Sequence, residues 1–193
     1  MREKLRSLRD TLEKEEVRSI SRRYFISNGF DGTLTSIGIA TGSYLSGVSD
    51  GGTVVSVGIG GAVGLCTSGV WSVWEIERAE KKAELHRLER AMLADLDETR
   101  VSEEKQEARA LNALMSGVGP LFGILLPLTP YLLEGTVLSM LQSTLGAVLV
   151  GVATLFAFGA YMGSIADIRW TVAGARMGLA GIVVAVVNVA LPG

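Results

Sequence analysis

The chain is poor in the residues from which enzyme active sites and disulfide frameworks are built. Its 193 residues include one cysteine, Cys66, and one histidine, His86. A single thiol forms no intrachain disulfide and no structural zinc site, and no Ser-His-Asp or Cys-His pair occurs with supporting context. The net charge of −2 argues against bulk nucleic-acid binding. We therefore expect neither an enzyme, nor a resident cofactor, nor a nucleic-acid partner.

Charged residues are scarce in five long stretches, and this scarcity predicts the fold. The stretches cover residues 24–48, 53–74, 111–133, 136–165 and 172–191. Each reaches the roughly 20 residues that a helix needs to cross a bilayer. We therefore expect an all-α integral membrane protein, in which residues 24–193 form a bundle of five transmembrane helices in contact with the lipid bilayer.

Lys and Arg are absent from two of the connections between these stretches, those around Asp50 and Glu134. Eight of the 18 fall in residues 1–23 and eight in residues 75–110, while Arg169 lies in the last connection and Arg176 lies near the start of the last span. With five spans, these three basic regions share one side of the membrane, which the positive-inside rule makes the cytoplasm. The N-terminus is then cytoplasmic, and the C-terminus lies outside or in a lumen.

Two segments outside the predicted spans carry most of the charge. Residues 1–23 have leucines on one face and bases among acids elsewhere, a pattern that predicts an amphipathic helix in the headgroup region. The alternative is a solvated lead-in to the first span. Residues 75–94 contain no Gly or Pro, so they are expected to prolong the second span as a rod. A further helix that starts near Ser102 completes a short cytoplasmic hairpin, residues 75–110.

Asp31 is the only acid or base in residues 24–48. A carboxylate in hydrocarbon costs roughly 2.5–3.5 kcal/mol, so such residues usually face a polar pathway or a partner. Hydroxyls and an amide from the same and neighbouring spans can line that pathway, and we select Thr35, Thr67 and Asn112. The alternative is structural: Asp31 can be the N-cap of a helix that starts at Gly32.

Glycine and proline mark where helices meet or end. Pairs of glycines four residues apart predict close helix contacts and an oligomer; they are Gly38 and Gly42, Gly60 and Gly64, Gly159 and Gly163, and Gly174 and Gly178. The third span contains Pro120, Pro127 and Pro130. The last two lie near its outer end and can terminate the helix. Pro120 is the candidate for a functional kink, whose freed carbonyl can line a polar cavity.

The predicted hairpin is rich in acids. Glu77, Glu80 and Glu84 are spaced i, i+3, i+7 and can share a cation, and Glu104 with Glu107 can do the same on the facing helix. Carboxylates suit hard divalent ions, and a nearby His86 or Met92 would suit Fe²⁺ or Mn²⁺. Interleaved Lys and Arg residues offer the alternative of an exposed, salt-bridged helix.

Taken together, these features resemble the vacuolar iron transporter family. The matching features are Asp31-Gly32 in a glycine-rich first span after a basic N-terminal helix, and a small-residue second span that continues into a Glu/Lys-rich helix. The third span carries Gly119-Pro120 and then Leu126-Pro127-Leu128-Thr129-Pro130-Tyr131. The chain departs from the family's S-M-x-x-G-E run in the second span, where Leu65 stands in place of methionine and Gly69 in place of glutamate, with Cys66 beside them.

The resemblance implies a homodimeric, five-helix exporter of Fe²⁺ or Mn²⁺ from the cytoplasm in exchange for protons. It places Asp31 on the ion path between two subunits and gives the hairpin glutamates a metal-gathering role. Two other readings stay open. The departures in the second span favour a transporter or channel of the same architecture for another cation or an organic solute. If the protein is instead a non-transporting membrane scaffold, we expect Asp31 to be a helix cap.

Overall fold

The computed structural model describes residues 15–92 and 100–191. The helices in chain order are α2 (Glu15–Leu45), α3 (Gly51–Met92), α4 (Arg100–Leu125), the short 3-10 helix η1 (Thr129–Leu133), α5 (Met140–Ile165) and α6 (Trp170–Ala190). Apart from an isolated bridge between Glu134 and Leu138, all regular structure in these ranges is helical. The all-α prediction is therefore confirmed. Residues 1–14 of the predicted amphipathic helix lie outside the described residues, and α2 is continuous across residue 23.

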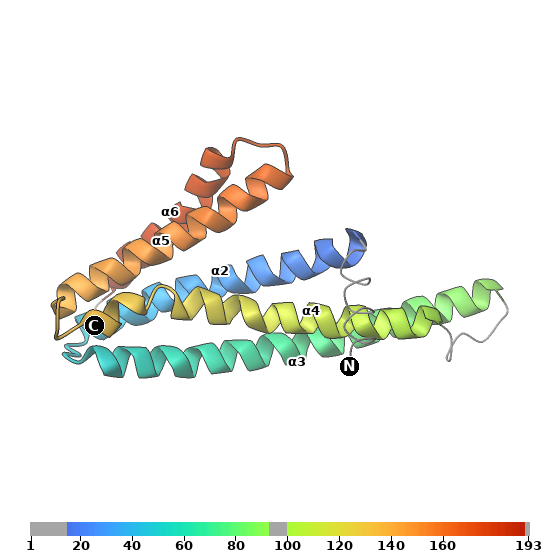
Figure 1. The fold of residues 1–193 in the computed structure, drawn as a ribbon, viewed down its shortest axis with the longest axis horizontal. Coiled ribbons are helices and arrows are strands. Elements are labelled where there is room, and N and C mark those ends of the chain that lie inside the picture. Colours follow the sequence, from blue (N-terminus) through green and yellow to red (C-terminus); the bar gives the residue numbers. More distant parts are fainter. Residues whose placement is uncertain (1–14, 93–99, 192–193) are drawn as a thin grey trace.

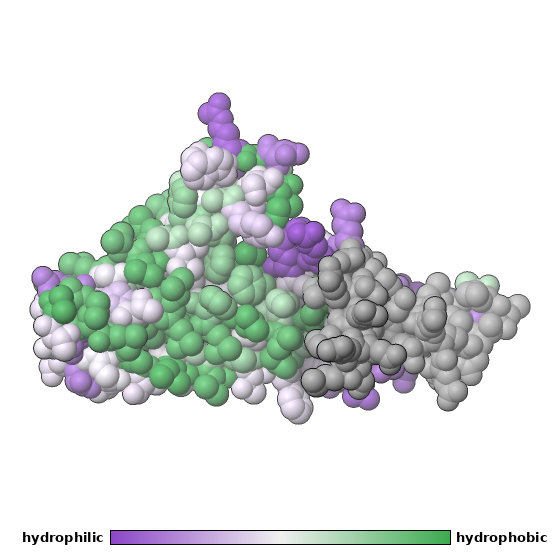
Figure 2. Space-filling model, viewed as in Figure 1, coloured by the Kyte–Doolittle hydropathy of each residue, from purple (hydrophilic) through white to green (hydrophobic). Residues whose placement is uncertain are grey.

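Segments of α3, α4, α5 and α6 are long and apolar enough to cross a membrane. The surface of the bundle is correspondingly hydrophobic (Figure 2), with exposed side chains such as Val63, Leu149 and Val189. An extended apolar surface of this kind marks contact with a membrane. The prediction of a multi-pass membrane protein is confirmed, whereas the count of five spans is not. α2 falls short of the apolar helices because Asn, Asp, Ser, Thr and Gly interrupt it.

α2 nevertheless runs through the bundle, packed along α4 (Figure 1). The α5–α6 hairpin packs against α2 and diverges from it toward the end where α2 begins. The 42 residues of α3 form one unbroken helix, as the rod prediction requires. At 1.5 Å per residue it is about 60 Å long, roughly twice the hydrocarbon thickness of a bilayer. Its charged C-terminal half therefore extends beyond the apolar part of the bundle.

The basic regions gather toward one end of the molecule. The start of α2, the end of α3, the start of α4 and the α5–α6 connection point toward that end in Figure 1, and the α2–α3 connection and η1 lie at the other. This separation is the arrangement that the distribution of Lys and Arg predicts. That the basic end lies in the cytoplasm stays a prediction.

The third predicted span is shorter than expected. α4 ends at Leu125 rather than at residue 133, and the chain continues through a turn into η1, which has Pro130 in its first turn. Pro127 and Pro130 cannot donate to a continuing helix, so they terminate it, as the sequence indicated. Pro120, by contrast, lies buried inside α4.

Glycine allows two close helix crossings. Between α2 and α4, a Cβ at Gly32 would lie 2.8 Å from the carbonyl oxygen of Pro120, and one at Gly123 would overlap the carbonyl oxygen of Gly29. Between α5 and α6, a Cβ at Gly159 would lie 2.5 Å from the carbonyl oxygen of Ala173. No side chain fits at these contacts without movement, which is the small-residue packing seen between membrane helices.

The glycine pairs singled out in the sequence divide into two classes. Gly159, Gly163, Gly174 and Gly178 all lie in the α5–α6 crossing. Gly42, Gly60 and Gly64 face open space, since a Cβ there would meet no described atom within 4 Å apart from its own stretch of helix, and Gly38 meets only the amide of Asn188 at 3.9 Å. Gly42, Gly60 and Gly64 therefore play no part in close helix packing within the described chain.

The two acids in the connections without Lys or Arg meet at the start of α3. Asp50 Oδ2 accepts hydrogen bonds from the Thr53 backbone N–H at 2.7 Å and from the Thr53 hydroxyl at 2.6 Å. Glu134 Oε2 accepts from the Gly51 N–H at 3.3 Å. Negative charge at a helix N-terminus is favourable because the first N–H groups have no intrahelical partner. These contacts fix the end of α3 that lies opposite the basic end.

Candidate functional site

A polar stripe follows one face of α2. Tyr24, Asn28, Asp31 and Thr35 are spaced i, i+4, i+7 and i+11, so they follow one another along the same side of a continuous helix. At 1.5 Å per residue the stripe is about 16 Å long, roughly half the thickness of the hydrocarbon core. It starts near the basic end of the bundle and leads toward its centre.

Asp31 lies in the interior of α2, so the alternative that it caps a helix starting at Gly32 is wrong. Its side chain is exposed on the surface of the single chain, and within the described residues no hydrogen bond or ion pair engages its carboxylate. Thr35 is exposed one turn further on, and its hydroxyl donates to the Asp31 carbonyl oxygen at 2.8 Å. The stripe thus presents a carboxylate with its oxygens available, next to a hydroxyl oxygen.

The other end of the stripe contacts a buried carboxylate. The Tyr24 hydroxyl donates to Glu77 Oε1 at 3.2 Å, and Glu77 is only 2% exposed although it follows the apolar part of α3. Its second oxygen, Oε2, has no hydrogen-bond partner among the residues that the structure describes. A buried carboxylate with one free oxygen retains acceptor capacity, and leaving it unused is costly.

Asn28 joins the stripe to the proline in α4. Pro120 has no N–H, so the carbonyl of Ser116, four residues earlier, lacks its intrahelical donor. The side-chain amide of Asn28 supplies that donor: Nδ2 lies 3.1 Å from the Ser116 carbonyl oxygen and also contacts the Ser116 hydroxyl. The freed carbonyl was expected to line a polar cavity, but it accepts a hydrogen bond from Asn28 of α2 instead. This contact fixes the rotation of the Asp31-bearing helix against α4.

A second buried pair holds the same two helices together. The Ser21 hydroxyl donates to Asn112 Oδ1 at 2.6 Å, and both residues are buried. Asn112 Nδ2 has no partner within the described part of the chain. Arg109, one turn away on α4, places its guanidinium 4.1 Å from the ring centroid of Trp74. Asn112, predicted to line the path, is therefore a buried contact between α2 and α4.

Sequence reasoning missed the roles of Ser21, Tyr24, Asn28 and Arg109. A signal was present: Ser21, Tyr24 and Asn28 repeat with helical spacing on α2, as Asn112 and Ser116 do on α4. Two polar rows in otherwise apolar helices predict that the rows face each other.

The remaining predicted path residue, Thr67, is exposed on α3, and no described hydrogen bond joins it to Asp31. The structure thus groups Asp31 with Thr35 on one face of α2. It gives Thr67 and Asn112 separate surroundings, so their place on a path stays a prediction.

The predicted metal ligands of the hairpin are dispersed over the described residues. Glu77 turns inward, whereas Glu80 and Glu84 are exposed, and Glu107 is half-buried. Lys81 pairs with Glu84 at 3.6 Å, and Arg78 with Glu75 at 3.8 Å, both at the i, i+3 spacing of a salt-bridged helix. The side chain of Glu104 lies outside the described residues. Across residues 15–92 and 100–191, no group of three or more His, Cys, Asp or Glu residues is placed to hold a metal ion.

Gly69 and Cys66, where the second span departs from the family's sequence run, both lie against α4. A Cβ at Gly69 would lie 2.9 Å from both the carbonyl and the hydroxyl oxygens of Ser116. A glutamate therefore does not fit at this position while α4 lies so close. Cys66 is half-buried, and its sulfur would lie 3.1 Å from a Cβ at Gly117. Cys66 thus belongs to the contact between α3 and α4.

Comparison with known proteins adds two findings. A sequence model of the VIT family matches residues 72–191, from the middle of α3 to the end of α6. An uncharacterized protein of Methanocaldococcus jannaschii is 23% identical over 185 residues, which cover 94% of this chain and 92% of that protein. The family match spans more than half of the chain and begins after α2.

Proposed function

The chain belongs to the VIT family, whose members are membrane transporters of metal ions, and on that premise we propose that it exports Fe²⁺ or Mn²⁺ from the cytoplasm in exchange for protons. One observation carries the proposal. Asp31 exposes a carboxylate with no partner among the described residues, in the middle of α2 and on a polar stripe that begins at the basic end of the bundle. Such a group is costly against lipid, so it requires an ion, a proton, water or a second subunit beside it.

The donor atoms of the stripe favour a hard cation. Asp31, Thr35, Asn28 and Tyr24 offer oxygen ligands, and the sulfur of Cys66 lies in a different helix contact. Carboxylate, carbonyl and water oxygens suit Mn²⁺, and they hold Fe²⁺ less tightly than sites with imidazole or thiolate do. We therefore expect this oxygen site to accept both Mn²⁺ and Fe²⁺.

The same carboxylate accounts for coupling to protons. A metal ion binds the ionised form of Asp31, so binding on one side displaces a proton, and protonation on the other side releases the ion. One carboxylate for each subunit is a sparse site. A homodimer with its two-fold axis beside α2 brings two Asp31 residues together, and the open Gly42 on the same helix permits close approach.

Flux of Mn²⁺ and Fe²⁺ in proteoliposomes tests the proposal. Asp31→Asn keeps the shape of the side chain and removes its charge, so we expect flux to fall by about tenfold or more, as for the loss of a charged ligand. Asp167→Asn is the matched control. Asp167 is exposed in the α5–α6 connection at φ 52°, a conformation that Asn also adopts. Equal flux in wild type and Asp31→Asn would refute the role of Asp31.

A second candidate is transport of another cation or an organic solute by the same architecture. It is favoured by the close packing at Gly69, which leaves no room for a carboxylate at that position of α3. Thermal unfolding in detergent separates the candidates, because a ligand that binds the folded state raises the unfolding temperature. Stabilisation by Mn²⁺ or Fe²⁺ supports metal transport, and stabilisation by another solute alone supports this candidate.

A further inference from the structure

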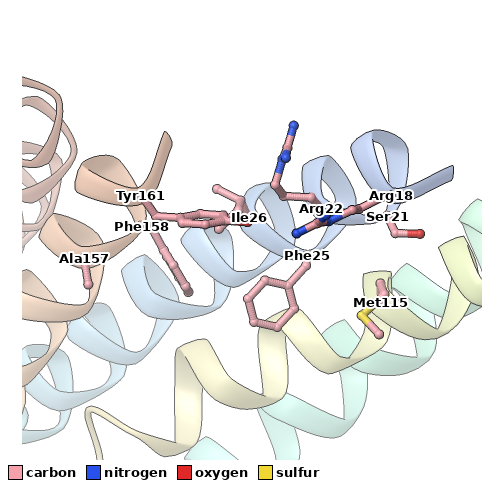
Figure 3. Close-up of a pocket in the computed structure, with 9 residues that line it drawn as sticks. All are labelled: Arg18, Ser21, Arg22, Phe25, Ile26, Met115, Ala157, Phe158 and Tyr161. Atoms are coloured by element: carbon pink, nitrogen blue, oxygen red, sulfur yellow. The ribbon is translucent and has the colours of Figure 1, made fainter. Parts of the chain in front are cut away.

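A groove with a cationic end separates α2 from the α5–α6 hairpin. It has a volume of about 490 Å³, within the range of small-molecule sites. Figure 3 shows its walls: α2 and α5 supply most of the lining, and α4 supplies Met115 at the base. The residues that matter here are Arg18, Arg22, Phe25, Met115, Phe158 and Tyr161.

The two ends of the groove differ in chemistry. Arg18 and Arg22 are one turn apart on α2, and no described carboxylate pairs with either guanidinium. Further along α2, the wall is aromatic: the Phe25 and Phe158 rings meet edge to face, with centroids 6.0 Å apart. The groove therefore offers positive charge at one end and an apolar wall over the rest of its length.

This distribution excludes the transported metal as the occupant. Among the described residues no carboxylate lines the groove, and the charged groups that do are two guanidinium groups, which repel a divalent cation. The complementary ligand carries an anion at one end and hydrocarbon at the other. The arginines belong to the first turns of α2, and the start of α2 lies toward the basic end of the bundle, where the headgroups of one leaflet would be (Figure 1).

We propose that the groove between α2 and α5 binds an anionic phospholipid, with its phosphate on Arg18 and Arg22 and an acyl chain along Phe25 and Phe158. Arginine suits this role because its planar guanidinium binds phosphate through two parallel N–H groups. Attraction of anionic lipids to basic residues at the cytoplasmic surface adds to the affinity. The lipid would fill the space where the α5–α6 hairpin diverges from α2, and so brace the hairpin against the helix that carries Asp31.

Thermal unfolding of the full chain in detergent tests this proposal without measuring transport. The additives are phosphatidylglycerol, phosphatidylcholine and diacylglycerol with the same acyl chains, and inorganic phosphate. We expect phosphatidylglycerol to raise the unfolding temperature more than the other three, because it alone supplies net negative charge and hydrocarbon together. Native mass spectrometry of the same samples gives the number of phosphatidylglycerol molecules bound.

Two variants act on the groove in different ways. Arg18→Gln/Arg22→Gln removes the cationic end, and we expect the apparent affinity for phosphatidylglycerol to fall roughly tenfold or more. Ala157→Trp fills the groove from an exposed position on α5, and should abolish the response while the arginines remain. Arg23→Gln/Arg169→Gln is the control for charge, since both residues are exposed and neither lines the groove. It should respond as wild type does.

Four results would overturn the proposal. An equal response to phosphatidylcholine would show that charge plays no part, and a full response to inorganic phosphate would show that hydrocarbon plays none. An unchanged response in both groove variants would place the lipid elsewhere. A change of oligomeric mass in Ala157→Trp would show that a second copy of the chain occupies the groove.

Discussion

At the scale of single residues, the direction of the Asp31 side chain depends on a hydrogen bond to the Ser116 carbonyl. Pro120 removes the helical donor of this carbonyl, and Asn28 replaces it from α2. Asn28 is one turn from Asp31, so the hydrogen bond that fixes the rotation of α2 also fixes the direction in which the carboxylate points. A proline in α4 thus has its structural effect on the neighbouring helix.

A double-mutant cycle tests this dependence. Asn28→Ala leaves the Ser116 carbonyl without a donor, and we expect it to lower the free energy of unfolding by about 1–3 kcal/mol. In a Pro120→Ala background the helix recovers its own N–H at residue 120, so the same substitution should cost less, with a coupling energy of about 1 kcal/mol. Unfolding in detergent measures all four proteins. Strict additivity would show that Asn28 does not replace the donor missing at Pro120.

At the scale of elements, the start of α3 is held by charge. The hydrogen bonds from the Thr53 hydroxyl and N–H lower the pKa of the Asp50 carboxyl below its ordinary value of 3.8. A carboxyl whose pKa is lower in the folded state stabilises that state above its unfolded pKa. The stabilisation is then lost as the pH falls through the folded pKa. The cap of α3 is therefore sensitive to acid.

Asp50→Asn separates this charge from the hydrogen bond. Asn is an equally good N-cap but carries no charge. Near pH 6 wild type keeps the negative charge of Asp50 at the start of α3, so we expect it to unfold at a higher temperature than Asp50→Asn. The difference should shrink as the pH falls below about 4, where the Asp50 carboxyl begins to gain its proton in the unfolded chain. A difference that stays constant between pH 6 and pH 3 would contradict the charge contribution of the cap.

The crossing of α2 and α4 depends on the absence of side chains. Gly123→Ala would press a methyl group on the Gly29 carbonyl, and we expect a loss of about 1–3 kcal/mol in the free energy of unfolding. Gly60→Ala adds the same methyl group in open space. It should be neutral or stabilising by up to about 1 kcal/mol, because alanine favours a helix more than glycine does. Similar destabilisation in both variants would show that the crossing is not tightly packed.

At the scale of the whole molecule, the single chain leaves two features uncovered. Asp31 presents its carboxylate on the outer surface, and Gly42, Gly60 and Gly64 present bare helix backbone. A carboxylate is costly against lipid, and bare helix backbone there makes no close helix contact. Both features are explained if another subunit packs against these positions. This is the physical support for the proposed homodimer.

Bulky residues at the open glycines test that assembly. Gly60→Leu/Gly64→Leu should convert a dimer to a monomer in detergent, as measured by light scattering. The unfolding temperature of the chain should not fall, because a Cβ at either glycine meets no described atom within 4 Å apart from its own stretch of helix. Ala153→Leu/Ala175→Leu, at exposed positions on α5 and α6, is the control and should leave the mass unchanged. A dimer that persists with both glycines replaced would place the interface elsewhere.

The sequence predicted the elements better than their contacts. It indicated the apolar segments that became α3, α5 and α6 and the extension of α3, but it placed the end of the third span at residue 133, whereas α4 ends at Leu125. It overestimated the apolar character of α2, which does not meet the criterion for a span. It also left open whether Asp31 caps a helix, since a glycine on each side is compatible with both readings. The continuity of α2 decided that question.

The course of each helix and the placement of charge at one end were determined by the sequence alone. Hydropathy, proline and the rise per residue act locally, so they can be read segment by segment. Only the tertiary structure showed that Glu77 is buried, that Asn28 donates to the carbonyl freed by Pro120, and that Asp31 faces outward. These outcomes depend on how α2 is rotated against helices more than fifty residues away. The close glycine contacts and a few buried hydrogen bonds between distant segments set that rotation.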